Sequence, residues 1–441
     1  MGRFVLRRTE SGRVKIAQVL GDASLGGVRS CILNYMRFAP KERFCFDFFV
    51  YEGSGGADLI CEGSGAPADG KSPQNGGANG NAGKGGCLQG SGGAETAAGR
   101  IPGDFAEEVR AIDPEAKVFS FPRIDRHPLA AMRALRRAFR DGGYAAVHAH
   151  MTTLSALVLP AAKAAGVPVR ICHAHSSFDR QSDHCFAKAA LRPFAAVCAT
   201  HRMACGKLAA ESLYRKKADE AFILPNAVDL SRFACAAPAI LPQDFSPAAL
   251  PQGSASAAPA QGLPPALPQN IRLLLFAGRF VPQKNLFFLL DAFAAALPLR
   301  PMALALLGDG PQKEALRAHA KMRGIEKSVL FLPPQDPAPW YAAADALVLP
   351  SLYEGMPVVA AEAQAAGIAC LFSDKVTREA DICGGAKFLP LDTEIWAQAM
   401  AGGLPPKADN AAKLAAAHYD IRTEAARLTD FYAAALAEAL R

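Results

Sequence analysis

Short apolar runs alternate with helical patterns from one end of this chain to the other, and this alternation limits its fold more than any other feature. The first run, Val14–Leu20, leads into a turn at Gly26-Gly27 and then into a helical pattern over Val28–Phe38. Strands that alternate with helices pair in parallel, because each helix carries the chain back to the start of the next strand. The pattern therefore predicts an α/β protein with helices on both faces of parallel sheets.

The same pattern gives the expected elements of each half. In the first half we expect strands at Cys45–Tyr51, Ala116–Ser120, Ala145–His148, Val167–Cys172, Ala195–Cys198 and Ala221–Leu224, with helices at Pro128–Asp141 and Thr153–Ala165. In the second half we expect strands at Ile271–Ala277, Met302–Leu307, Val329–Leu332, Ala346–Leu349 and Ala369–Phe372, with helices at Leu286–Leu297, Gln312–Arg323 and Val358–Ala366. The last segment, Asn410–Arg441, predicts one or two helices and no strand.

Two segments fit neither array of strands and helices. Residues 53–103 hold seventeen of the 38 glycines, which predicts a disordered insertion. Residues 236–270 hold eight of the 32 prolines, which predicts a linker between domains. A chain of 441 residues has room for two such domains. We therefore expect an N-terminal domain over residues 1–235 and a C-terminal domain over residues 271–405, followed by helices over residues 406–441.

Composition and charge exclude several classes of protein. Hydrophobic residues make up 51% of the chain and charged residues 20%, which excludes wholesale disorder and a coiled-coil rod. The net charge of +7 is too small for a dedicated nucleic-acid binder, so no nucleic-acid partner is expected. The 11 cysteines are scattered without a C-x-x-C pair, which favours a reducing compartment. No signal peptide or membrane span is apparent in the sequence, so we expect a cytoplasmic protein, with room for peripheral attachment to a membrane.

The strongest chemical signal begins at the strand that ends in Gly278. Arg279 follows that strand directly and Lys284 comes soon after, at the strand end where open parallel sheets place their ligands. Two cations there suit a diphosphate, although a strand-end arginine alone is more often a solvated charge. The later run Gly308-Asp309-Gly310-Pro311 permits close approach of the backbone to a ligand, and is equally consistent with a plain loop between a strand and a helix.

A second signal lies at the start of the helix expected after Leu349. Pro357 suits a first helical position, and the N–H groups of Gly355, Met356 and Val358 would be helix-start donors able to hold a phosphate or a sugar hydroxyl. Glu354 would then stand at the mouth of this helix. Glu362, eight residues later, could accept hydrogen bonds from ribose hydroxyls or could be an ordinary surface carboxylate.

Together these residues resemble the retaining glycosyltransferases of family 4, which have the GT-B fold of two Rossmann-like domains facing a cleft. The resemblance rests on Gly-Arg…Lys, on Gly-Asp-Gly-Pro and on the Glu-x7-Glu element, in that order. In the first half, Gly26-Gly27 resembles the family's glycine loop, and Arg170–Ser176 resembles its histidine segment in the form seen in capsule and exopolysaccharide transferases. Pro225-Asn226-Ala227-Val228-Asp229 resembles a further family element, with Ala227 in place of the usual glycine.

This resemblance implies a role for each candidate residue. Arg279 and Lys284 would hold the diphosphate of a nucleotide-sugar donor, Glu354 would contact the sugar, and Glu362 would bind the ribose. His175 or His173 would lie in the cleft near the reacting groups. The implied catalytic residues are His175, Arg279, Lys284 and Glu354. The implied substrate-binding residues are Gly26, Gly27, His173, Asn226, Gly308, Gly310, Gly355, Met356, Pro357, Val358 and Glu362.

The implied activity is retaining, metal-independent transfer of a hexose to a glycan or lipid-linked acceptor in surface polysaccharide biosynthesis. No cofactor is expected. No metal is expected either: the chain lacks Asp-x-Asp, and no Asp, Glu or Cys ligand set is spaced to join the histidines at 148, 150, 173 and 175. The family also implies that the C-terminal helices pack back on the N-terminal domain. The alternatives are a GT-B sugar-nucleotide epimerase and a catalytically degenerate, sugar-nucleotide-binding assembly subunit.

One basic helix face bears on partners. Arg133, Arg136, Arg137 and Arg140 recur at the spacing of one face of a helix. Such a face could dock on anionic lipid, and is equally consistent with a solvated helix surface. Few aromatic residues interleave these arginines, which argues against single-stranded nucleic acid as the ligand.

Overall fold

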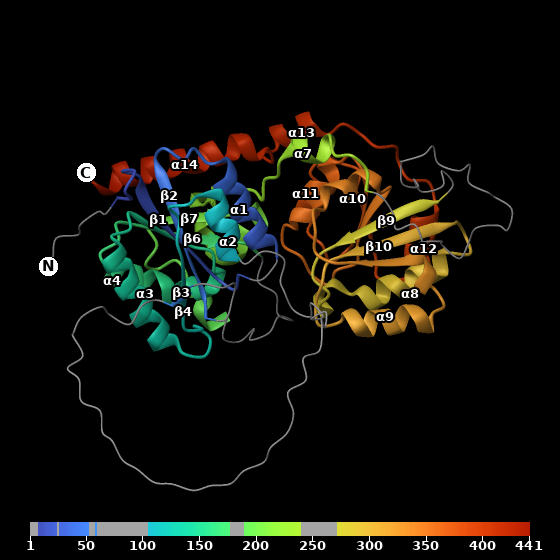
Figure 1. Cartoon of the computed structure of the whole chain (residues 1–441), viewed down its shortest axis with the longest axis horizontal. Helices are drawn as coiled ribbons and strands as arrows, with labels where there is room; N and C mark the ends of the chain where they lie inside the picture. The colour runs from blue at the N-terminus through green and yellow to red at the C-terminus, as the bar shows by residue number, and fades with distance from the viewer. Residues whose placement is uncertain (1–7, 24–25, 53–57, 60–104, 177–188, 240–270) are drawn as a thin grey trace, which may run out of the picture.

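The computed structural model describes residues 8–23, 26–52, 58–59, 105–176, 189–239 and 271–441. Within these residues the chain forms two parallel sheets with helices packed around them, and Figure 1 shows the two lobes side by side. The α/β class and the two Rossmann-like domains expected from the alternating pattern are confirmed. Within the described residues, no helix combines the length and apolar character needed to cross a bilayer.

The first sheet contains eight described strands, each parallel to its neighbours. Their order across the sheet is β3 (Asp58–Leu59), β4 (Val118–Phe121), β2 (Phe44–Tyr51), β1 (Val14–Gly21), β5 (Ala146–Ala149), β6 (Val169–Ala174), β7 (His201–Ala204) and β8 (Phe222–Ile223). The helices of this half are α1 (Gly27–Phe38), α2 (Phe105–Ile112), α3 (Pro128–Gly142), α4 (Ser155–Ala164), α6 (Lys207–Tyr214) and α7 (Leu230–Ala234).

The second sheet contains six described strands, again all parallel. Their order is β11 (Val329–Leu332), β10 (Met302–Leu307), β9 (Arg272–Ala277), β12 (Ala346–Leu349), β13 (Ala369–Ser373) and β14 (Lys387–Leu389). The helices are α8 (Leu286–Ala296), α9 (Lys313–Met322), α10 (Ala338–Ala343), α11 (Val358–Ala365), α12 (Thr393–Ala401), α13 (Ala411–Ala416) and α14 (Ile421–Ala439).

The central strands are continuous apolar runs because both faces of each sheet are covered. All eight residues of β2 are buried, and all six of β9 are buried. The one charge on β2, Asp47, is fully buried, where it accepts a hydrogen bond from the Tyr144 hydroxyl at 2.8 Å and pairs with Lys15 at 3.1 Å. These partners offset the desolvation of the carboxylate, which is why a charge is tolerated inside the sheet.

The chain returns to the first lobe through its last helix. Two backbone hydrogen bonds join Val228 of the first lobe to the start of this helix. The Val228 N–H donates to the Tyr419 carbonyl at 3.0 Å, and the Ile421 N–H donates to the Val228 carbonyl at 3.1 Å. From there α14 packs along α1 (Figure 1). Its Tyr432 is fully buried, with its ring centroid 5.8 Å from that of Phe44. The last helix is therefore part of the first lobe's core.

Three expectations about elements differ from the structure. The strand expected at Ala195–Cys198 is wrong: that segment forms turns, and the strand of this region is β7, six residues later. Alanine favours helices and turns over strands, and Val197 is 69% exposed, so the short apolar run is not a core strand. Two short strands, β3 and β14, were not expected, and β3 lies within the glycine-rich segment.

The expected domain boundaries stay a prediction. Of residues 53–103, the structure describes only the two residues of β3. The expected disorder of this insertion therefore lies outside the described residues. The expected linker is described only at residues 236–239. The region after residue 405 contains α13 and α14, in line with the helices expected there.

Candidate functional site

A cavity of about 720 Å³ lies between the two lobes, and residues of both line it. The first lobe contributes the loop after β1, the ends of β5 and β6, and Asn226. The second lobe contributes the loop after β9 and the segment that leads into α11. The expected site residues that line the cavity are Gly26, Gly27, His175, Asn226, Arg279, Lys284, Glu354, Gly355, Met356, Pro357 and Val358.

Arg279 and Lys284 of the second lobe lie just beyond the carboxyl end of β9, the position expected from the sequence. Lys284 lies in the turn before α8 and forms an ion pair with Glu354. Arg279 is exposed to the cavity, and among the described residues no carboxylate pairs with it. Glu354 therefore neutralises the charge of Lys284, whereas the charge of Arg279 is available to a ligand.

Two hydrogen bonds hold the turn that carries Lys284 against the loop that carries Glu354. The Gln283 side-chain amide donates to the Tyr353 carbonyl at 2.9 Å, and the Leu352 N–H donates to the Gln283 carbonyl at 2.8 Å. This clamp fixes both side chains before any ligand arrives, which reduces the ordering that binding requires.

The N-terminus of α11 points at the same cavity. Pro357, Val358 and Val359 line it. Pro357 is the N-cap of α11, with φ −71° and ψ 124°, rather than the first helical residue as expected. The shift of one position follows from the extended ψ angle of Pro357, and it leaves the helix-start dipole directed at the cavity. Positive partial charge from α11 and full charge from Arg279 therefore meet at one wall.

The two lobes touch at the segment before α11. Asn226 donates through Nδ2 to the Met356 carbonyl at 2.7 Å. A Cβ atom on Gly355 would lie 3.1 Å from Ser176 Cα and 3.3 Å from the His175 carbonyl, so a side chain here would require the facing backbone to move by a few tenths of an ångström. The contact places Glu354 and His175 on facing sides of the cavity.

His173 and His175, which the sequence left as alternatives for the cleft, occupy different positions in the structure. His175 follows β6 and lines the cavity, as does His150. His173 is 2% exposed and is not among the residues that line the cavity, and the substrate-binding role expected for it stays a prediction. Side chains two residues apart on one strand share a face, but His173 lies one step deeper in the sheet.

Comparison with known proteins decides the family. The model for "Glycosyltransferase Family 4" matches residues 95–232, and the model for "Glycosyl transferases group 1" matches residues 271–404. A protein of Bacillus subtilis named as the glycosyltransferase EpsF is 27% identical over 96% of this chain and 97% of its own length. An Escherichia coli UDP-Gal:alpha-D-GlcNAc-diphosphoundecaprenol alpha-1,3-galactosyltransferase is 27% identical over 60% of this chain and 67% of its own.

This chain belongs to the family 4 glycosyltransferases. It is accordingly an enzyme that uses a nucleotide sugar. Its fold is that of Anabaena HepE, solved in complex with UDP and glucose, with a TM-score of 0.64 at 16% identity over 96% of this chain and 100% of that one. That likeness confirms the GT-B fold.

In this glycosyltransferase, Gly308 and Gly310 do not line the cavity, and their expected contact with substrate stays a prediction. A Cβ atom on Gly308, whose φ is +151°, would lie 1.9 Å from the Gly278 carbonyl oxygen. A Cβ atom on Gly310 would lie 2.5 Å from the Phe280 carbonyl oxygen. Both glycines instead let the loop after β10 pack on the backbone of the loop that presents Arg279. They act on the site by supporting that loop.

Glu362 also lies away from the cavity lining. It sits one turn into α11, where its carboxylate accepts a hydrogen bond from the Tyr341 hydroxyl at 3.0 Å. Burial raises the pKa of Glu362 to about 7, although the bond from Tyr341 works in the opposite direction. The expected contact with ribose stays a prediction, and the described partner of Glu362 is Tyr341.

Several residues that line the cavity could not be found by sequence reasoning. Thr152 lies in the turn after β5 with φ +47°, a conformation that β-branched residues rarely adopt. Gln283 and Tyr353 form the clamp between the two loops of the second lobe. Such residues carry no motif, because backbone strain and loop-to-loop hydrogen bonds appear only in three dimensions. The position of Gln283 beside Lys284 was the one available hint.

Replacing Gly308 tests the supporting role of the loop after β10. We expect Gly308→Ala to lower the free energy of unfolding by about 3 kcal/mol, because its Cβ would overlap the backbone of the neighbouring loop at a φ angle that alanine disfavours. Thermal unfolding measures this. Gly403→Ala is the matched control, since its Cβ meets nothing within 4 Å, and it should change stability by no more than about 0.5 kcal/mol. Equal effects of the two variants would contradict the packing argument.

Replacing Glu362 tests its buried environment. The folded-state pKa of about 7 lies above the usual 4.5, so the stability that protonation provides is complete below about pH 4.5 and is lost as the pH rises through 7. Glu362→Gln should therefore raise the melting temperature at pH 8, by the equivalent of roughly 3 kcal/mol, and leave it unchanged near pH 4.5. The control is Glu314→Gln, whose side chain is 85% exposed. A variant that is less stable than the parent at pH 8 would show that ionised Glu362 is favourably paired.

Proposed function

We propose that this enzyme transfers a hexose from a nucleoside-diphosphate sugar to a glycan or lipid-linked acceptor, with retention of the anomeric configuration and without a metal ion, in surface polysaccharide biosynthesis. One observation carries the proposal. Arg279, Lys284 and the N-terminus of α11 converge on one wall of the cavity, with Glu354 among them. This is a preformed site for a diphosphate that carries a sugar.

The same groups suit the charge that develops during the reaction. As the bond between the anomeric carbon and the diphosphate breaks, negative charge grows on the leaving oxygen. Fixed cations and helix-start N–H groups stabilise such charge without reorganising. Because Arg279 and the N-terminus of α11 supply positive charge at this wall, a divalent ion is not required for the step.

Retention follows from a front-face exchange. The acceptor oxygen forms its bond to the anomeric carbon on the side from which the diphosphate departs, and its proton passes to the departing diphosphate oxygen. The groups facing the sugar from the other wall are His175 and the turn that contains Thr152. Glu354 is paired with Lys284, which suits a role in binding the sugar rather than in attacking it.

The acceptor is inferred from relatives. The Escherichia coli relative acts, by its name, on a sugar linked to diphosphoundecaprenol. The likeness to EpsF along almost the whole chain, together with the histidine segment, supports a role in exopolysaccharide assembly. A lipid-linked acceptor is presented at the inner face of the plasma membrane, so we place the enzyme in the cytoplasm and in peripheral contact with that surface.

A basic face on the first lobe fits such contact. The four arginines of α3, at positions 133, 136, 137 and 140, are all exposed, while Leu135 and Phe139 of the same helix are fully buried. Leu129, at the start of α3, is 66% exposed. A cationic helix face with an exposed apolar residue at one end matches the chemistry of an anionic bilayer surface.

Donor binding is tested by thermal stabilisation with UDP, GDP, ADP and CMP, each with and without a chelator. We expect one nucleoside diphosphate to raise the melting temperature regardless of chelator, because a ligand that binds only the folded state stabilises it by mass action. Arg279→Ala and Lys284→Ala should each weaken that shift by about tenfold in apparent affinity. Lys321→Ala, an exposed lysine of α9 outside the cavity, is the control.

Two results would argue against this donor site. A shift that disappears with chelator would indicate a metal-dependent enzyme. A free sugar or an epimerised nucleotide sugar formed without any acceptor would favour the epimerase, and donor binding with no turnover on any acceptor would favour the degenerate subunit.

Membrane contact is tested by sedimentation with vesicles. We expect binding to vesicles that contain anionic phospholipid and none to neutral ones. Each arginine near the surface contributes roughly 1 kcal/mol, so Arg136→Glu with Arg137→Glu should abolish binding at physiological salt. The control is Lys321→Glu with Lys327→Glu, an equal change of charge on the second lobe. Equal loss of vesicle binding in both double variants would show that binding depends on net charge alone, and would contradict a specific role for the α3 face.

A further inference from the structure

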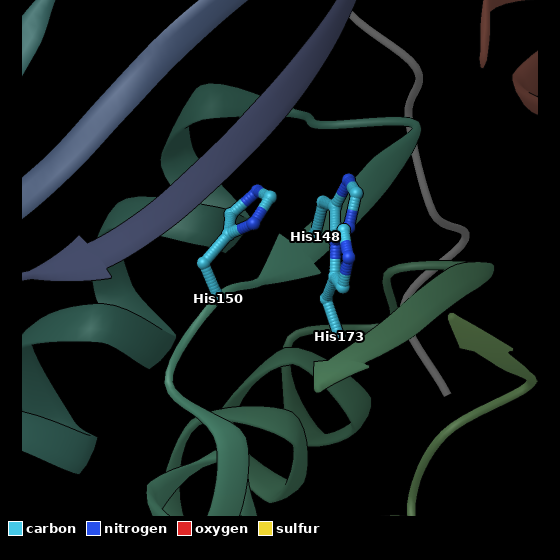
Figure 2. A group of neighbouring side chains, drawn as sticks. All are labelled: His148, His150 and His173. Carbon is cyan, nitrogen blue, oxygen red and sulfur yellow. The ribbon is translucent and has the colours of Figure 1, made fainter. Parts of the chain in front are cut away.

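Four histidines form a stack behind the cavity wall of the first lobe. His148 and His150 lie at the end of β5, and His173 and His175 at the end of β6, the neighbouring strand. The rings of His148 and His150 stack with centroids 4.0 Å apart, and those of His173 and His175 do the same at 4.0 Å. Figure 2 shows three of these side chains gathered above the two strand ends.

Hydrogen bonds join the stack to Gln18 on β1 and to Tyr432 on α14, forming two arms that start at one hydroxyl. On the first arm, the Gln18 amide donates through Nε2 to the Tyr432 oxygen at 3.0 Å, and Gln18 Oε1 lies 2.7 Å from His150 Nε2. His150 Nδ1 then lies 2.8 Å from His175 Nε2.

The second arm leaves the same hydroxyl in the other direction. Tyr432 Oη lies 2.6 Å from His148 Nδ1. His148 Nε2 in turn lies 3.0 Å from His173 Nδ1. Gln18, His148, His150 and His173 are each less than 10% exposed, and Tyr432 is fully buried, so water does not compete for these bonds.

The chemistry of Gln18 fixes the proton positions along the first arm. A carbonyl oxygen can only accept, so His150 must carry its proton on Nε2 and donate it to Gln18. His150 Nδ1 is then an acceptor, which requires His175 to carry its proton on Nε2 as well. The remaining nitrogen of His175, Nδ1, is left with a lone pair.

The second arm follows by the same reasoning. The Tyr432 oxygen already accepts from Gln18, so its one proton is donated to His148 Nδ1. His148 then carries its own proton on Nε2 and donates it to His173 Nδ1. All four imidazoles are therefore in the Nε2–H tautomer. Reversing the Gln18 amide would reverse every one of these bonds and would place all four protons on Nδ1.

The stack is electrically neutral at physiological pH. Burial lowers the pKa of His175 to about 3, and burial together with the neighbouring imidazoles holds the pKa values of His148, His150 and His173 well below the usual 6.5. Beside the rings lie Cys31, Tyr35 and Tyr432, and burial raises the pKa of each of these groups. The stack therefore keeps its tautomers across the pH range of the cytoplasm.

The end of the first arm reaches the cavity. His175 lines it, and His175 Nδ1 is a buried atom without a hydrogen-bond partner among the described residues. We propose that Gln18 and Tyr432 are positioning residues that hold His175 in the Nε2–H tautomer, so that Nδ1 accepts a hydrogen bond from a sugar hydroxyl in the cavity. The nature of this ligand rests on the proposed function, whereas the tautomer does not.

A metal ion is the competing interpretation of the same cluster. Nitrogen atoms of His148, His150 and His173 lie within 4.8 Å of one another, close enough to share an ion. Four hydrogen bonds occupy both ring nitrogens of His148 and His150, so an ion bound by these two residues would break at least two of the four, because a bound nitrogen uses its lone pair for the metal. The hydrogen-bonded network instead gives a partner to both ring nitrogens of His148 and of His150 and to Nδ1 of His173, while Nε2 of His173 has no hydrogen-bond partner among the described residues.

The test is nitrogen NMR of the full-length enzyme labelled with 15N-histidine and free of substrate. We expect the four buried histidines to show Nε2–H chemical shifts that do not change between pH 6 and pH 8. Nδ1–H shifts, titration in this range, or a stoichiometric metal found by elemental analysis would each overturn the proposal. This spectrum does not depend on what the enzyme transfers, so its failure is distinct from failure of the proposed function.

Tyr432→Phe supplies the second readout. Without the hydroxyl, His148 loses its donor and the Gln18 amide loses its acceptor, so we expect mixed tautomers at His148 and His150 and a fall of about tenfold in kcat/KM. Tyr144→Phe is the matched control, because it also removes a buried hydroxyl, bonded at 2.8 Å to Asp47, and touches no histidine. Loss of activity with an unchanged histidine spectrum in Tyr432→Phe would overturn the proposal. So would a changed spectrum in Tyr144→Phe.

Discussion

The contact between the segment before α11 and the end of β6 is the constraint on which the site depends. Gly355 approaches the backbone of His175 and Ser176 closely, and Asn226 bonds to the Met356 carbonyl at 2.7 Å. Without this contact the cations of one lobe and the histidines of the other would belong to separate surfaces. With it they line one cavity.

Each lobe prepares its own side of that contact. In the second lobe, the hydrogen bond between Gln283 and Tyr353 and the ion pair between Lys284 and Glu354 hold these side chains in place along the cavity. In the first lobe, the sheet ends are backed by α14, whose Tyr432 bonds to His148 in the interior. Through Gln18 and His150 the same hydroxyl is also joined to His175, which lines the cavity. The return of the chain to the first lobe therefore links its last helix to the cavity wall as well as to the core.

Much of this arrangement could be predicted from the sequence, because it depends on local patterns. The alternation of strands and helices predicted both sheets, and Arg279, Lys284 and Glu354 stand at strand ends or helix starts where a pattern can place them. Other features depend on distant contacts. The packing of Gly308 and Gly310 against the neighbouring loop and the hydrogen bond from Tyr341 to Glu362 are visible only in three dimensions. The link from Tyr432 to His148 joins residues 284 positions apart, which no local pattern can reveal.

We propose that the diphosphate of the donor binds between Arg279, Lys284 and the N-terminus of α11. A crystal structure with a bound nucleoside diphosphate is the most direct test. We expect phosphate oxygens within hydrogen-bond distance of both cations and of the first N–H groups of α11, with the sugar end directed toward His175. A diphosphate bound instead on the Gly26-Gly27 loop of the first lobe, with Arg279 and Lys284 left in solvent, would contradict it.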